Sequence, residues 1–204
     1  MTSRRCDRTW GWSASTCLRI PPVRLSPSCT PCGTAIGFRR LVLVCPTPRV
    51  VGIEVSDQDR RETAELRRNE PWYAEAFGAF ERIWSGHPTD DDWDAIEPFM
   101  HGRWDAAQQA QVAREASLTN TAAAAEYYAP GALEPEGVRS AIAHLDVPVL
   151  LIAGELDVAL PTGPAAAYAS LFPRGELVVV PNAGHSPWQD NPRTCVDTIA
   201  RFLG

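Results

Sequence analysis

Unbroken apolar runs give the clearest hydrophobic pattern in this chain. Val149–Ala153 is an aliphatic run that ends at Gly154, and Glu176–Val180 repeats the pattern and ends at Pro181. Arg40–Val44 is a third run of the same kind. Aliphatic runs of this length, bounded by turn residues, are typical of strands buried on both faces. We therefore predict three strands of a mostly parallel sheet.

Helical patterns surround the predicted strands. Ser56, Thr89 and Asp105 have the side chains that cap helix starts. Pro71 suits a first helical position, and four aromatic residues follow it at helical spacing: Tyr73, Phe77, Phe80 and Trp84. Further helices are predicted from Asn120 or Thr121 to just before Pro130, near 136–144, from Thr162, and from Asn191. The last of them is expected to bury Val196, Ile199 and Phe202 or Leu203. Short, polar-faced helices at about 55–130, inserted between strands, indicate a helical lid.

The first 39 residues show neither the strand period nor the helix period. Prolines interrupt them repeatedly, so we expect an irregular segment over 1–39, either disordered or translated out of frame. Cys29 and Cys32 form a C-x-x-C motif, which is compatible with a zinc knuckle or a redox pair. No second C-x-x-C exists, no histidine precedes His87, and no strand pattern leads into the motif. Incidental cysteines are therefore the favoured interpretation.

Charge and composition narrow the function classes. The chain of 204 residues has a net charge of −6, which gives no electrostatic footprint for nucleic acid. No apolar run approaches the roughly 20 residues of a membrane span. The first residues carry arginines without an apolar stretch behind them, so no signal peptide is expected and the cytoplasm is the predicted location.

Two residues near the C-terminus carry the candidate chemistry. Asp157 follows the strand at 149–153, and His185 follows the strand at 176–180. A right-handed crossover would place both strand ends side by side, where ligand chemistry in open α/β sheets gathers. An acid and a histidine so placed are typical of the second and third members of a catalytic triad, with His185 as general base. Glu155 is the alternative acid, but it lies earlier in the turn.

Other polar residues have simpler interpretations. Surface roles are expected for His87, His101 and His144, the last at a helix end where a cation is favoured. The run Asp90–Asp92 could resemble a metal cluster, but acids are favoured at the helix start that Thr89 predicts. The lid aromatics either line a substrate pocket or pack the lid, and packing is favoured for most of them: Trp72, Phe77, Trp84, Trp93 and Trp104.

The order of acid and then histidine on the last two strands resembles the α/β-hydrolase fold. The strings GELD and NAGHSPW look most like its proline-iminopeptidase-like branch. The resemblance covers Arg40–Gly204, so the expected fold class is α/β, an incomplete α/β-hydrolase whose lid lies at about 55–130 and whose N-terminal sheet strands are absent. It implies hydrolysis of a small-molecule ester or amide through an acyl-enzyme, without cofactor or metal. The sequence does not separate a peptidase from a small-ester hydrolase.

The nucleophile that this resemblance requires is not found. No G-x-S-x-G string occurs in the chain. Ser26 and Ser28 lie among prolines, and Ser186 lies beside His185 on the wrong element. We therefore expect the chain as written to be inactive. The alternative from another class is a non-catalytic fragment or binding remnant, and sheet edges left without neighbours would favour self-association.

A frameshift just before Leu41 would explain the N-terminal segment. Residues 1–48 carry seven arginines and one acid, and no lysine occurs anywhere, which suggests a GC-rich gene in which a wrong frame can stay open. In the shifted frame, each new codon joins the third base of one codon to the first two bases of the next. The protein sequence leaves most third bases free, and a suitable choice of them encodes AHSAG at the codons of Arg19 to Val23. This is a small-x-Ser-x-Gly elbow.

The nucleotide sequence of the gene tests this hypothesis directly. We predict an open frame that encodes a serine across the Ile20–Pro21 junction. A stop codon in that frame within codons 2–38, or the lack of that serine, would rule the frameshift out.

Overall fold

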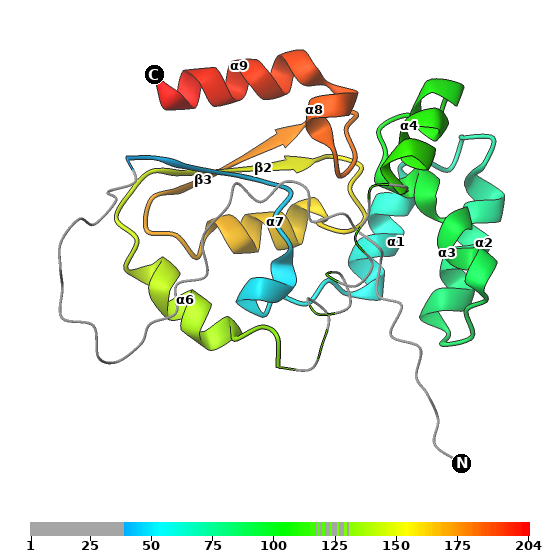
Figure 1. Ribbon diagram of the computed structural model, residues 1–204, viewed down its shortest axis with the longest axis horizontal. Helices are drawn as coiled ribbons and strands as arrows, with labels where there is room; N and C mark the ends of the chain where they lie inside the picture. The colour runs from blue at the N-terminus through cyan, green and yellow to red at the C-terminus, as the bar shows by residue number, and fades with distance from the viewer. Residues whose placement is uncertain are drawn as a thin grey trace.

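A three-stranded parallel sheet lies at the centre of the computed structural model (Figure 1). The structure describes residues 39–116, 118, 120, 123, 126, 129 and 131–204. The strands are β1 (Leu41–Val44), β2 (Val149–Gly154) and β3 (Gly175–Val180), in the order β1-β2-β3. All three predicted strands and their parallel direction are confirmed. The C-x-x-C motif, Ser26, Ser28 and the proposed frameshifted segment lie outside the described residues.

The three strands differ in burial because they differ in position. All six residues of β2 are buried, since β2 pairs with a strand on each side. The residues of β1 are half-buried, and β3 is exposed or half-buried except at Val180. The prediction of burial on both faces is therefore right for β2 only. Among the described residues, β1 and β3 each have one neighbouring strand.

Helices cover both faces of the sheet (Figure 1). On one face, Val149, Leu151 and Ala153 pack against α7 (Thr162–Ala169), α6 (Pro135–Ala143) and the 3-10 helix η1 (Pro48–Val51). On the other face, Leu150 and Ile152 pack against α9 (Pro192–Leu203). Alternation along β2 thus supplies both cores, which is why its sequence is apolar at consecutive positions.

The last helix starts where the sequence predicts and buries a slightly different face. The Asn191 side chain accepts a hydrogen bond from the backbone N–H of Thr194 at 3.3 Å, which caps α9. Cys195 and Thr198 are buried, with Ile199 and Phe202 packed beside them. Val196 is exposed, so its predicted burial is wrong. Of the alternatives Phe202 and Leu203, it is Phe202 that packs against the core, while Leu203 is exposed. Val196 and Leu203 each directly follow a packed residue, Cys195 or Phe202, and a step of one residue turns the side chain away from the buried face of the helix.

The helices of residues 57–116 gather at one side of the sheet (Figure 1). They are α1 (Asp57–Glu65), α2 (Tyr73–Trp84), α3 (Asp90–Ala95), the 3-10 helix η2 (Glu97–Met100) and α4 (Ala106–Ala116). Ser56 and Thr89 form capping boxes, as their positions predict, and the Asp105 side chain accepts from the backbone N–H of Gln108. Pro71 precedes α2 by two residues instead of starting it. The predicted helix near 120–130 lies largely outside the described residues.

An aromatic cluster holds these helices together. Phe80 and Phe99 are fully buried and lie 4.8 Å apart between ring centroids. Most of the predicted lid aromatics pack in or against this cluster, which confirms the packing interpretation: Trp72, Phe77, Trp84 and Trp93. Val158, from the loop after β2, is buried in the same cluster. The loop that carries Asp157 is therefore anchored to the helical region.

None of the helices that the structure describes is long and apolar enough to cross a membrane.

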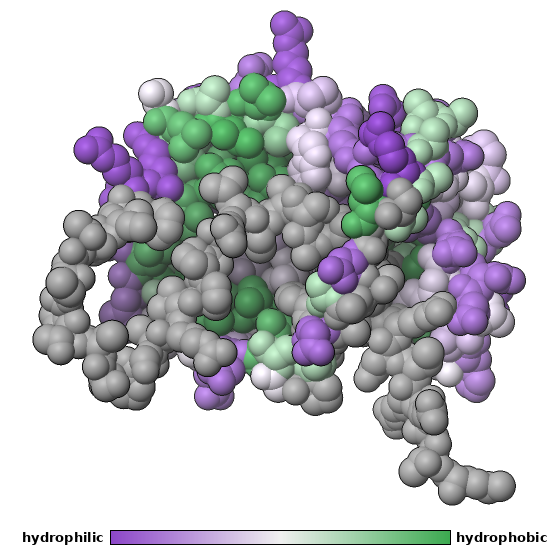
Figure 2. Space-filling model, viewed as in Figure 1, coloured by the Kyte–Doolittle hydropathy of each residue, from purple (hydrophilic) through white to green (hydrophobic). Residues whose placement is uncertain are grey.

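Apolar side chains remain on the surface of the sheet and of α9. Figure 2 shows hydrophobic residues gathered around α9 and β1, at the upper left. Val196 and Leu203 on α9 are 60% and 53% exposed, and Val179 on β3 is 37% exposed. Exposed apolar faces and strand edges with one neighbour favour association between chains.

We predict concentration-dependent self-association that involves the β3 edge. Val179→Lys should reduce the average mass measured by light scattering, because a charge on an edge strand opposes strand pairing. Leu66→Lys is the matched control, since Leu66 is 61% exposed and lies in the helical region. A monodisperse monomer of the unaltered chain at all concentrations would contradict the prediction.

Candidate active site

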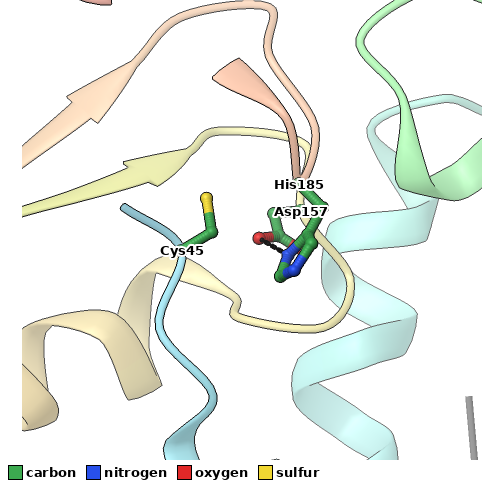
Figure 3. A group of neighbouring side chains, drawn as sticks. All are labelled: Cys45, Asp157 and His185. Atoms are coloured by element: carbon green, nitrogen blue, oxygen red, sulfur yellow. Dashed lines mark hydrogen bonds and ion pairs between the residues drawn. The ribbon is translucent and has the colours of Figure 1, made fainter. Parts of the chain in front are cut away.

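Asp157 and His185 form a hydrogen-bonded pair at one edge of the sheet (Figure 3). His185 Nδ1 lies 2.8 Å from Asp157 Oδ2. The Asp157 side chain is completely buried, and the His185 side chain is 26% exposed. The two residues follow β2 and β3, whose parallel pairing brings their carboxyl ends together. The proximity that the sequence predicts for these two side chains is present.

Backbone amides fix the Asp157 carboxylate. Its Oδ1 accepts hydrogen bonds from the N–H groups of Ala159 at 2.8 Å and Leu160 at 3.1 Å. Burial by itself would raise the pKa of Asp157. The His185 charge, its hydrogen bond and the two amides outweigh that effect and hold the pKa below its usual value. Asp157 therefore stays ionised and can orient the ring that it contacts.

Glu155, the alternative acid, has a different partner. Its Oε2 accepts a hydrogen bond from the backbone N–H of Asn182 at 2.8 Å. This contact ties the β2 loop to the β3 loop, and Asn182 has a left-handed φ of 54°. The two loops approach closely, since a Cβ added at Gly154 would lie 2.1 Å from the Gly184 carbonyl oxygen. Asp157 is therefore the acid that contacts His185, and Glu155 helps to shape the loop.

The end of η2 and the residues after it contact the loop that carries His185. The backbone N–H of His185 donates to the Met100 carbonyl at 2.8 Å. Asp190 Oδ2 accepts from the N–H groups of Gly184 at 2.9 Å and Gly102 at 2.8 Å. A Cβ at Gly184 would lie 2.3 Å from the Met100 carbonyl oxygen, so this approach requires glycine. Asp190 could not be identified from the sequence, because no local pattern indicates that its side chain joins the loops of Gly184 and Gly102.

His101 is part of this support, so the prediction of a surface role is wrong for it. It is buried, and Gln108 and Glu97 provide hydrogen-bond partners for its two ring nitrogens, each at 3.0 Å. Its carbonyl accepts from Arg67 Nη1 at 2.6 Å, and its ring stacks on Trp104. Trp104 therefore packs as well.

The other histidines agree with their predicted roles. His87 is exposed. His144 lies at the C-terminal end of α6, where its Nδ1 is 2.7 Å from the Ser140 carbonyl oxygen.

The acidic run at 90–92 starts α3, as the helix-start interpretation predicts. Asp92 is buried and accepts hydrogen bonds from Arg82 and from the backbone N–H of Thr89. The bond from Arg82 is the main reason that the pKa of Asp92 falls to about 2. These contacts give Asp92 a structural role at the helix N-terminus.

Cys45 is a third polar side chain beside the pair, and the sequence analysis did not single it out. Its sulfur, a carboxylate oxygen of Asp157 and a ring nitrogen of His185 all lie within 4.8 Å of one another. Burial, and then the negative charge of Asp157, raise the pKa of the Cys45 thiol well above its usual value. Cys45 directly follows β1, so the strand-end rule that identified Asp157 and His185 would also have identified it.

Two surface hollows lie away from this group. One lies beside α4 and Gln189, and the other lies between the sheet and the end of α9. Neither is lined by Asp157 or His185. We take the strand-end group as the candidate site, because it joins a buried, ionised carboxylate to a hydrogen-bonded imidazole that is partly exposed.

Several known proteins are similar to this chain. A 70-residue stretch is 34% identical to pimeloyl-[acyl-carrier protein] methyl ester esterase of Nitrosomonas europaea, and it covers 33% of this chain and 28% of that protein. MenH from S. aureus superposes with a TM-score of 0.49 and 20% identity, over 82% of this chain and 59% of that one. Proline iminopeptidase from Mycobacterium smegmatis superposes with a TM-score of 0.49 and 21% identity, over 80% of this chain and 56% of that one. The chain thus spans less than two thirds of each of these relatives.

The family model of the α/β hydrolases matches residues 10–198. The match begins before Arg40, so it includes part of the segment that the sequence analysis placed outside the domain. It also includes all three strands, the helical region and both residues of the hydrogen-bonded pair. The chain therefore belongs to the α/β hydrolase family.

Proposed function

We propose that residues 40–204 supply the acid and the base of a hydrolase for small carboxylic esters. The observation that carries this proposal is the 2.8 Å contact between His185 Nδ1 and a buried, ionised Asp157. A carboxylate in this position holds the imidazole in the tautomer that has its hydrogen on Nδ1. Nε2 is then the nitrogen that takes a proton from a nucleophile and returns it to the leaving group.

The rigidity of the surroundings suits this role. Each oxygen of Asp157 has a hydrogen-bond partner, and the backbone of His185 is held by Met100. A general base contributes roughly 10²–10⁴ in rate when it is held within hydrogen-bonding reach of the transferred proton. Asp190 contributes to this positioning through the two loops that it joins.

An ester is the favoured substrate class because the matched stretch of the Nitrosomonas protein belongs to a methyl ester esterase. An amide is the second candidate, since the strings GELD and NAGHSPW resemble the proline-iminopeptidase-like branch. The two classes share the same acid and base, and they differ in the leaving group that His185 must protonate.

Cys45 does not supply the nucleophile in this proposal. A thiol attacks as its thiolate, and burial together with the charge of Asp157 keeps Cys45 protonated. The sequence contains no G-x-S-x-G elbow, so the chain as written should not form an acyl-enzyme. A binding remnant without turnover is the alternative function.

A chain in which the product of the other reading frame replaces residues 2–38, and to which the missing N-terminal strands are restored, tests the proposal. It should hydrolyse p-nitrophenyl butyrate and react with a fluorophosphonate probe. His185→Ala and Asp157→Asn should each remove most of the rate, by about 10²-fold or more. Glu155→Gln is the matched control and should change the rate much less, because Glu155 contacts Asn182 instead of the imidazole.

The unaltered chain is the second reference in this experiment and should remain unlabelled by the probe. Stoichiometric labelling of it that depends on His185 would contradict the proposed inactivity. A larger loss of rate in Glu155→Gln than in Asp157→Asn would show that the acid is misassigned.

The shifted pKa of Asp157 predicts how stability depends on pH. The folded-state pKa lies below the unfolded value of about 3.9. The ionised carboxylate therefore stabilises the fold above that pH, and the contribution is lost as the pH falls through the folded-state pKa. Asp157→Asn should lower the unfolding free energy by about 1–3 kcal/mol at neutral pH.

The difference between the two proteins should shrink below about pH 4 in denaturant titrations. Asp146→Asn is a suitable control, since the Asp146 side chain is 88% exposed and its nearest cation, Arg174, is 4.0 Å away. Its effect should stay within about 0.5 kcal/mol. A difference for Asp157→Asn that grows on acidification would contradict the assigned direction of the pKa.

A further inference from the structure

A sulfur, an oxygen and a nitrogen atom, each able to bind a metal ion, lie close together at the end of the sheet. They are Cys45 Sγ, a carboxylate oxygen of Asp157 and a ring nitrogen of His185, all within 4.8 Å of one another. They follow β1, β2 and β3 respectively, so three separate strands position them (Figure 3). The parallel register of the sheet thus assembles a sulfur, oxygen and nitrogen donor set that proton transfer alone does not require.

The backbone commits Cys45 to this place. Its N–H donates to the Ile152 carbonyl at 2.8 Å, which extends the pairing of β1 with β2 by one residue. Its φ is 42°, in the left-handed region, which is unfavourable for a residue with a Cβ. Such conformations persist where the surroundings fix them, and they cluster at binding and catalytic sites.

The spacing of the donors is close to that of a zinc site. A Zn²⁺ ion lies about 2.3 Å from sulfur and about 2.0–2.2 Å from nitrogen or oxygen, so two ligand atoms on one tetrahedral ion are roughly 3–4 Å apart. His185 Nδ1 and Asp157 Oδ2 are 2.8 Å apart and need to open slightly. All donor atoms of the group lie within 4.8 Å of one another, so a pair wider than the zinc spacing needs to close by at most about 1–2 Å.

The chemistry of the donors selects the metal. Sulfur and imidazole favour zinc over magnesium or calcium, which prefer oxygen ligands. A carboxylate buried beside a thiol is also a negative environment that a divalent cation neutralises. The amides of Ala159 and Leu160 hold the other Asp157 oxygen and would orient the carboxylate toward the ion.

We infer that Cys45, Asp157 and His185 bind one Zn²⁺ ion, with a fourth position for water. On binding, the Cys45 thiol releases its proton to solvent and the His185 ring hydrogen moves to Nε2, so that Nδ1 can bind the ion. No oxidation or reduction takes place. The bound ion withdraws His185 from proton transfer. The site goes beyond the proposed function, and binding itself needs no nucleophile.

Cobalt titration of the full-length chain tests the site, because thiolate-bound Co²⁺ gives a charge-transfer band in the near ultraviolet. A background with Cys6, Cys17, Cys29 and Cys32 changed to serine removes the other thiols of the N-terminal segment. This background should bind one Co²⁺ per chain with the band present, and Zn²⁺ should displace the cobalt.

Cys45→Ala should abolish the band and weaken binding by at least about tenfold. Cys195→Ala is the matched control, since Cys195 is also a buried free thiol. This control should keep both the cobalt band and the binding affinity. His185→Gln should retain the band and weaken binding by at least about tenfold. Circular dichroism shows whether Cys45→Ala folds. If it does not, His185→Gln tests the metal site, because the His185 side chain is partly exposed and its replacement disturbs the fold less.

No cobalt band in the background chain, or a band that survives Cys45→Ala, would overturn the inference. Undiminished affinity in His185→Gln would do the same. Metal binding is measured without substrate, whereas ester hydrolysis is measured with a chelator present. The failure of one proposal is therefore distinguishable from the failure of the other.

Discussion

The parallel pairing of β2 with both of its neighbours is the constraint on which the candidate site depends. Parallel strands end at the same edge of a sheet, so the residues after β1, β2 and β3 meet there. Burial of all six residues of β2 fixes this register, because a slip by one residue would exchange the side chains of its two faces. The positions of Cys45, Asp157 and His185 follow from that register.

Close loop packing then converts proximity into a defined geometry. Glycine at 154 allows the β2 and β3 loops to touch, and glycine at 184 allows the β3 loop to approach Met100. Asp190 joins the histidine loop to the segment after η2. The same segment carries His101, whose buried contacts link it to α4 and to Arg67. The helical region therefore supports His185 through the backbone.

The two proposals for this site use one set of atoms in different ways. Proton transfer needs the hydrogen bond between Asp157 and His185, and it makes no use of a thiol. Zinc binding needs that hydrogen bond to open and the thiol to ionise. Because both compete for His185, metal availability would set whether the base can act.

The sequence by itself determined the three strands, the capped helix starts and the placement of Asp157 and His185 at neighbouring strand ends, where the structure brings them into contact. Each depends on local signals: apolar runs, Ser56 and Thr89 as caps, and polar residues directly after strands. Only the tertiary structure decided which strand is fully buried, that Val196 faces outward, and that His101 is enclosed. It also brought Cys45 and Asp190 to the site. These outcomes depend on which neighbour lies against each residue, and contacts between Gly102 and Asp190, 88 positions apart, leave no local pattern in a single sequence.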